Sequence, residues 1–77
     1  MSIPIGLTGR IIKGEGAGGY VKVIDDSAAT GGLLILTSRC ADMNPAHDNW
    51  VRGIGELAEY FNESGWVVEW LSKPSGH

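Results

Sequence analysis

Hydrophobic residues in the C-terminal third follow first a helical period and then a strand period. The helical part is a stripe with spacings of four, three, one and three residues: Trp50, Ile54, Leu57, Ala58 and Phe61. Ser64-Gly65 ends the helix, because glycine suits the left-handed residue just past the last turn. From Trp66 the period is two, with one face formed by Trp66, Val68 and Trp70 and the other by Val67, Glu69 and Leu71. The pattern predicts a helix over 54–64 and a strand over 66–71, with Trp66 folded back onto Tyr60 or Phe61, and it places much of the core here.

Three segments nearer the N-terminus have strand patterns. Residues 10–13 are a β-branched run bounded by glycines, and residues 20–25 alternate, with Val21 and Val23 on one face. Residues 33–38 are apolar on both faces, which predicts a central strand covered on both sides or nearly so. Short connections rich in glycine, aspartate and serine favour turns between these segments. An antiparallel meander of three strands is therefore expected.

The stretch from Arg39 to Asn49 is a long connection for so small a chain, and it precedes the helix. The order is then β-β-β-α-β, an α+β fold with one small sheet and one helix packed on one face. A crossover helix would place the last strand parallel to the third strand, or to the first at the other edge. If the long connection first returns across the sheet, the last strand becomes antiparallel; the sequence leaves both options open.

Size and composition limit the function classes. The 77 residues, 43% hydrophobic and 19% charged, predict one globular domain over 1–77, with an ordered core of about 10–71 and a polar tail at 72–77. A chain of this size has little room for a large cofactor, so we expect a non-enzymatic protein with no cofactor. No apolar run approaches the roughly 18 residues of a membrane helix, and the N-terminus lacks a signal-peptide pattern. A single cysteine, Cys40, excludes an internal disulfide, and a cytoplasmic location is expected.

The net charge of −3 is unevenly distributed. Residues 1–41 are slightly basic, whereas residues 42–71 carry six carboxylates against Arg52 alone. An acidic half repels phosphate backbones and attracts basic surfaces, so a basic protein partner is expected rather than nucleic acid or a membrane.

The segment Gly14–Gly19 satisfies the spacing G-x-G-x-x-G. A dinucleotide-binding fingerprint must open a helix, and here a strand follows. The kinase version of the loop requires further motifs that 77 residues cannot hold. The segment is interpreted as a flexible hairpin loop.

The long connection contains four residues with the side chains of metal or nucleophilic sites: Cys40, Asp42, His47 and Asp48. Zinc sites usually have two closely spaced pairs of cysteine or histidine ligands, and the second pair is missing, so no metal is expected. A hydrolase using a Cys40–His47 pair would also need an orienting group, an oxyanion hole and a cleft.

Glu56, Glu59 and Glu63 form an acidic stripe on the predicted helix. Such a stripe is usually the solvated side of an amphipathic helix, and Glu56 also suits the positive end of the helix dipole. The functional interpretation joins the stripe to nearby acidic and aromatic residues as a surface for a basic partner. The predicted partner-binding residues are Asp42, Asp48, Trp50, Glu56, Glu59, Tyr60 and Glu63.

Two stretches resemble small acidic bacterial immunity proteins of polymorphic or contact-dependent toxin systems. They are the glycine-glycine-aliphatic run Gly31–Leu36, and the run from Asp48 through the tyrosine-phenylalanine pair of the helix to the G-W-x-V-E-W strand ending at Leu71. The resemblance implies a protein that binds a toxin domain tightly and occludes its active site.

The alternative function is that of a small regulatory or ligand-sensing domain with a pocket between the 39–49 loop and the tryptophans. Homo-oligomerisation through a free sheet edge is compatible with either.

Overall fold

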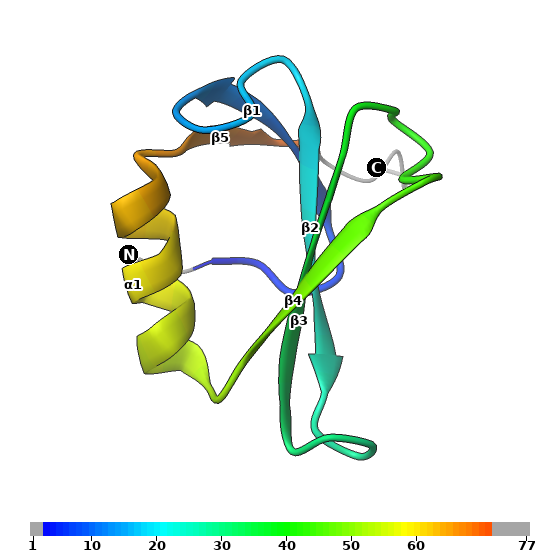
Figure 1. The fold of residues 1–77 in the computed structure, drawn as a ribbon, viewed down its shortest axis with the longest axis vertical. Coiled ribbons are helices and arrows are strands. Elements are labelled where there is room, and N and C mark those ends of the chain that lie inside the picture. Colours follow the sequence, from blue (N-terminus) through cyan, green and yellow to red (C-terminus); the bar gives the residue numbers. More distant parts are fainter. Residues whose placement is uncertain (1–2, 72–77) are drawn as a thin grey trace.

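The computed structural model describes residues 3–71, which form five strands and one helix (Figure 1). Their bounds are β1 Thr8–Lys13, β2 Tyr20–Asp26, β3 Gly32–Ser38, β4 His47–Val51, α1 Ile54–Ser64 and β5 Val67–Trp70. The strands form one sheet in the order β4-β3-β2-β1-β5, and every neighbouring pair is antiparallel. The predicted α+β class, with a single sheet and a single helix, is confirmed. The predicted tail at 72–77 lies outside the described residues.

Strand β4 corrects the prediction of one long loop over 39–49. Residues 47–51 continue the meander beside β3, with Cα partners running from Leu33↔Val51 to Thr37↔His47. The sequence underpredicted this strand because His47, Asp48 and Asn49 have low strand propensity. Since β4 returns the chain across the sheet, α1 leads into a β5 that is antiparallel to β1 at the opposite edge. The antiparallel option is therefore the observed one.

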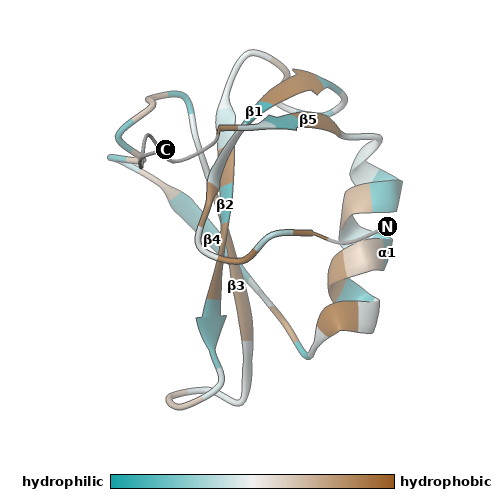
Figure 2. Cartoon of the chain, turned by 180° about the vertical axis from the view of Figure 1, so that it is seen from behind, coloured by the Kyte–Doolittle hydropathy of each residue, from teal (hydrophilic) through white to brown (hydrophobic). Residues whose placement is uncertain are grey.

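The core lies between one face of the sheet and the helix. This inner face takes alternate residues of each strand, and α1 covers it (Figure 1). Eight hydrophobic side chains are buried there: Ile11, Val21, Val23, Leu33, Ile35, Val51, Leu57 and Phe61. Figure 2 shows both hydrophobic and hydrophilic segments along α1, as expected of an amphipathic helix lying over a core. The prediction that Val21 and Val23 share one face of their strand is confirmed, and that face is the buried one.

The sheet bends around this core. In Figure 1, β1 and β5 run across the direction of β2, β3 and β4, and the β1–β5 pairing shifts register between Ile11 and Lys13. Gly9 of β1 allows the close packing of β5, because a Cβ at this position would lie 2.4 Å from Val68 Cγ1 and 2.7 Å from Trp70 Cε3.

The helix stripe is narrower than predicted. Leu57 and Phe61 are buried, but Ile54 is 65% exposed and Ala58 is also exposed. Trp50 belongs to β4 rather than to the helix and is 47% exposed. Leu57 and Phe61 are thus the only fully covered helix positions, with Tyr60 half-buried against the core.

The predicted helix stop and its aromatic contacts are confirmed. Gly65 has the left-handed φ of 68°, and its N–H donates to Asn62 O while the N–H of Trp66 donates to Phe61 O. The Trp66 ring then packs edge-on against Phe61, with centroids 4.8 Å apart, and tilted against Tyr60 at 5.6 Å. Trp66, Val68 and Trp70 pack against the core as predicted.

Strand β3 is central, as predicted, but its two faces differ. Leu33 and Ile35 are buried on the inner face, whereas Leu34 and Leu36 on the outer face are only half-buried. Strands β4 and β5 each have one neighbour, so within residues 3–71 both outer edges of the sheet are unpaired. Among the described residues no helix has the length and hydrophobicity needed to cross a membrane.

Candidate functional site

The inner face of the sheet changes character halfway along β3 and β4. The cross-strand pair Leu33↔Val51 is apolar, but the next pair toward the β3–β4 loop joins Ile35 to Asn49, and the following pair joins Thr37 to His47. Polar side chains on the face that elsewhere forms the core have no packing reason to be there. Departures of this kind from the fold's own pattern are expected at functional sites.

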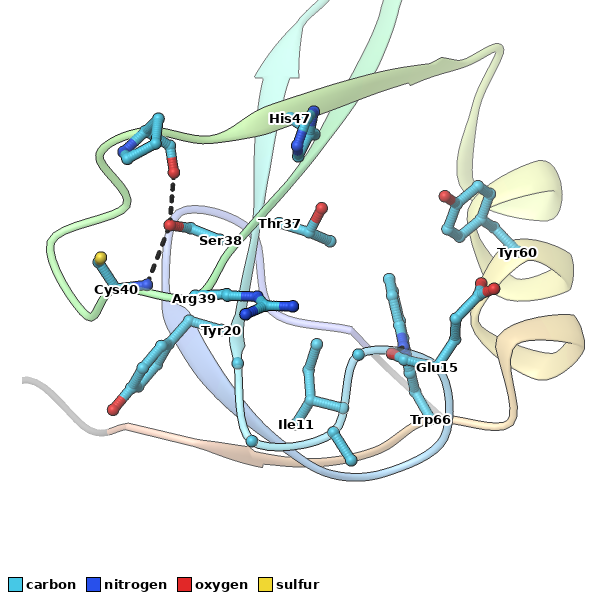
Figure 3. Close-up of a pocket in the computed structure, with 15 residues that line it drawn as sticks. Ile11, Glu15, Tyr20, Thr37, Ser38, Arg39, Cys40, His47, Tyr60 and Trp66 are labelled. Atoms are coloured by element: carbon cyan, nitrogen blue, oxygen red, sulfur yellow. Dashed lines mark hydrogen bonds between the residues drawn. The ribbon is translucent and has the colours of Figure 1, made fainter.

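Thr37 and His47 border an open cavity of about 930 Å³ at one end of the molecule (Figure 3). The cavity lies beyond the end of the core, between the β1–β2 loop, the β3–β4 loop and the last turns of α1. Ile11, 2% exposed, belongs to both the core and the cavity lining. Tyr60 and Trp66 contribute the ring surfaces of the wall on the helix side. A volume of this size is in the range of small-molecule sites, which are typically about 300–1,000 Å³.

The β1–β2 loop is a hairpin connection, as predicted, and it is attached to the end of the helix. The Glu15 N–H donates to Ser64 O over 3.0 Å, and the Trp66 indole Nε1–H donates to Glu15 O over 2.6 Å. Gly14, with a φ of +102°, lies so close that an added Cβ would be 2.5 Å from Gly65 O. These contacts order one wall of the cavity.

The same loop is not a phosphate cradle. A cradle needs main-chain N–H groups aimed outward at the anion. Here four N–H groups donate to main-chain carbonyls of this chain, namely those of Glu15, Ala17, Gly18 and Gly19. The glycines of the G-x-G-x-x-G spacing therefore form a compact turn.

The β3–β4 loop forms the opposite wall. Ser38 Oγ donates to Pro45 O over 2.5 Å and accepts the Cys40 N–H over 3.1 Å, which closes the base of the loop. Arg39 directly follows β3, and Figure 3 shows its guanidinium extended over the opening toward the Trp66 side. His47 borders the same opening from β4.

Tyr60 connects the helix to the polar half of the sheet. Its hydroxyl oxygen accepts a 3.0 Å hydrogen bond from Asn49 Nδ2. Because the oxygen is the acceptor in that bond, the hydroxyl proton remains able to donate in another direction. Figure 3 shows the hydroxyl on the cavity side of the ring.

Cys40 and His47 both border the cavity, but they are not arranged as a nucleophilic pair. Cys40 is exposed, and in Figure 3 its sulfur points away from the cavity centre. Within residues 3–71, no three side chains among His, Cys, Asp and Glu are grouped as a metal site would require.

The seven predicted partner-binding residues do not form one surface. Asp48 and Trp50 share the outer face of the sheet with Leu36 and Leu34, their partners on β3, so they lie on the side away from the helix. Trp50 Nε1 donates to Thr30 Oγ1 over 2.9 Å. The predicted surface of helix plus 39–49 loop is thus divided between opposite sides of the sheet.

The remaining predicted residues have different local roles. Asp42 Oδ1 accepts the Asn44 N–H over 3.1 Å within the β3–β4 loop, and Glu56 Oε1 accepts the Arg52 N–H over 2.8 Å at the start of α1. Tyr60 belongs to the cavity wall. Glu59 and Glu63 are exposed on the helix.

Arg39 and Thr37 were missed as site residues. A signal was present, because both continue the odd-numbered row of the 33–38 strand past its apolar part. Its meaning depended on recognising β4, which places His47 opposite Thr37 and Asn49 opposite Ile35. Comparison with protein-family models, with curated proteins and with solved structures finds no match for this chain. The site is therefore interpreted from its own geometry.

Proposed function

We propose that the protein is a non-enzymatic binding module of the immunity type, which binds and neutralises a basic bacterial toxin domain. The proposal is supported by the acidic composition of residues 42–71 and by the exposed carboxylates of α1. The partner would contact the helix side of the molecule, with Glu59 and Glu63 at its centre. Asp48 and Trp50, on the opposite face, would lie outside that contact.

The observation that carries the proposal is the position of Glu63. It lies in the last turn of α1, which contains no basic residue, and it follows Glu59 by four positions. A negative charge near a helix C-terminus opposes the helix dipole, and like charges four residues apart repel each other. Each effect costs the helix a few tenths of a kcal/mol, or up to about 1 kcal/mol for the dipole term. In a complex with a basic partner, the negative charges of Glu59 and Glu63 would be attracted to the positive charges of the partner.

The first test concerns the chain alone. Glu63→Lys should raise the free energy of unfolding by several tenths of a kcal/mol, measured by urea denaturation at low salt. Asp48→Lys, the same charge change on the outer face of β4, is the matched control and should show no comparable gain. A loss of stability in Glu63→Lys would remove the electrostatic basis of the proposal.

The second test concerns the partner. The expected partner is the product of a toxin-like reading frame adjacent to the gene, purified and measured by stopped-flow association. Glu59→Lys/Glu63→Lys should slow association at least tenfold at low salt, and the difference should shrink as salt increases. Equal rates for this variant and Asp48→Lys would contradict the helix assignment, and a gene neighbourhood without such a reading frame would contradict the immunity-type function.

A second candidate function, a small ligand-binding regulatory domain, is supported by the end cavity. Its wall contains Trp66, whose indole is half-buried and fixed by the hydrogen bond to Glu15 O. A ligand in the cavity should therefore change tryptophan fluorescence saturably. Trp66→Phe should remove that change, whereas Trp50→Phe, on the outer face, should keep it.

A further inference from the structure

We propose that the end cavity binds a monoanionic carboxylate with a flat apolar body, and that Arg39 holds the carboxylate while Trp66 and Tyr60 contact the body. This inference rests on the second candidate function and names its ligand class. The carboxylate belongs either to a free aromatic acid or to the C-terminus of a peptide with an aromatic last residue. Both sources present the same chemistry to the site.

The carboxylate end is assigned from Arg39. Arg39 is the first residue after β3, and it borders the cavity together with Thr37 and Ser38. A guanidinium offers planar pairs of N–H donors that match the two oxygens of a carboxylate. Figure 3 shows this group extended over the opening rather than folded back along β3.

Two further groups add donors around the same opening. The Tyr60 hydroxyl accepts from Asn49 Nδ2, so its own proton is available to an acceptor in the cavity. His47 lies opposite Thr37 in the β3–β4 pairing, and both border the cavity. One guanidinium with hydrogen-bonding side chains around it suits a single negative charge.

Phosphate is disfavoured by two observations. The main-chain N–H groups of the β1–β2 loop that would surround a phosphate donate to carbonyls of the chain itself. Glu15, on the wall that includes Trp66, adds a carboxylate to the cavity lining, which repels a second negative charge. A monoanion meets less repulsion than a dianion.

The body of the ligand is assigned from the wall opposite Arg39. Trp66 is held by its indole hydrogen bond and by edge-on packing against Phe61, so its ring surface is ordered before a ligand arrives. The Tyr60 ring is tilted by 54° to it, and the buried Ile11 side chain adds apolar surface to the lining. Flat apolar groups gain most from such surfaces, through area burial and ring contacts.

The test uses the full chain, labelled with ¹⁵N, and a matched pair of probes: 3-phenylpropionate and its neutral amide, 3-phenylpropionamide. NMR titration should show saturable shifts of the Arg39 Nε–H and Trp66 Nε1–H signals with the acid, at a Kd at least tenfold lower than with the amide. Acetate, which lacks the body, should bind more weakly than the aromatic acid. Equal affinities for the acid and the amide would overturn the assignment of the carboxylate.

Two arginine variants complete the test. Arg39→Gln should weaken binding of the acid at least tenfold and leave that of the amide unchanged. Arg52→Gln is the control, because Arg52 is also exposed but borders a separate, smaller hollow beside the β2–β3 loop. Equal losses in the two variants would show a nonspecific charge effect and overturn the proposal.

A peptide pair separates the two sources of the carboxylate. Acetyl-Ala-Ala-Phe should bind more tightly than 3-phenylpropionate if a peptide C-terminus is the natural ligand, and its C-terminal amide should bind at least tenfold more weakly. Tighter binding of the free acid would indicate a small molecule. If only the neutral probes bind, the carboxylate inference fails and the ligand-binding function survives; if no probe shifts Trp66 Nε1–H, the inference fails together with the second candidate function.

Discussion

The two halves of the sheet's inner face are made from the same strands but contain opposite kinds of side chain. In one half, Leu33, Ile35 and Val51 pack beneath α1 and are buried. In the other, Thr37 and His47 border a cavity, with Tyr60 of the helix and Trp66 just after it at the edge. The first half contributes to folding stability through apolar burial, and the second presents hydrogen-bonding groups to whatever enters the cavity.

This difference shows that a polar residue on the inner face of the sheet indicates a functional site better than a charged residue on the exposed surface does. The acidic helix surface attracts attention in the sequence, yet Glu56 accepts a main-chain hydrogen bond at the helix start. Thr37 is unremarkable in the sequence, but with His47 opposite it occupies a face where the fold elsewhere places aliphatic residues. Along β3, the buried Ile35 and the cavity-lining Thr37 are thus only two residues apart.

The largest expected effect tests that separation directly. Ile35→Ala should lower the free energy of unfolding by about 2–5 kcal/mol, because Ile35 is fully buried and the change leaves a cavity. Thr37→Ala, two residues along the same row, should cost less than about 1 kcal/mol, since no closely packed side chain is lost. Urea denaturation of both variants is the measurement. Similar costs at the two positions would show that the polar half is part of the core.

The second prediction tests whether the cavity wall is built onto the helix end. Gly14→Ala should destabilise by about 2–3 kcal/mol, because its φ of +102° is strained for alanine and its Cβ would meet Gly65 O. Gly18→Ala is matched, with a φ of +95° and open space around the added Cβ, and should cost about 1–2 kcal/mol. Thermal unfolding measures both. Equal losses would mean that the contact between the loop and the helix end contributes nothing.

A smaller effect is expected at Trp66. Trp66→Phe removes the indole N–H that donates to Glu15 O and should cost about 1 kcal/mol for the hydrogen bond, beyond the loss of ring area. Trp70→Phe is the reference for ring area, because Trp70 stacks on Phe61 at 6.1 Å. Hydrogen exchange at the Glu15 amide, which donates to Ser64 O, should become faster in Trp66→Phe only. Unchanged exchange would show that the indole does not hold the loop.

The smallest effect is expected at the opposite end of the sheet, in the β2–β3 turn. The Ser27 main-chain N–H, which donates to Asp25 Oδ1 over 2.9 Å, holds the pKa of Asp25 below its ordinary value of 3.8, with a further contribution from the Ser27 side chain. The unfolded chain therefore takes up this proton at a higher pH than the folded one. The stabilisation is present above the ordinary value and is lost as the pH falls through the lowered pKa.

Asp25→Asn tests this contribution, because asparagine keeps the acceptor oxygen but does not titrate. The stability advantage of the wild type over the variant should be larger at pH 6 than at pH 3, measured by urea denaturation at both values. A constant difference would contradict the assignment. Neither cavity probe should bind differently to this variant, since the turn lies at the other end of the strands.

Local chemistry made much of this fold predictable. The period change at Trp66, the left-handed Gly65 and the alternation of Val21 and Val23 each depend on residues close together in sequence, and all three predictions are confirmed. Strand β4 was not predictable in this way, because its polar residues form a strand by pairing with β3. Without β4, the direction of β5 stayed open and the polar row had no partner.

The sequence by itself determined the class of the fold, the helix bounds and the sides of β2 and β5 that pack inward, because hydrophobic periodicity and glycine conformation act over a few residues. Only the tertiary structure decided where the core ends. Long-range pairing placed His47 opposite Thr37, attached the β1–β2 loop to the helix end and left a cavity between them. Such contacts join residues far apart in the chain, and their free energy depends on the complete set of neighbours rather than on any local pattern.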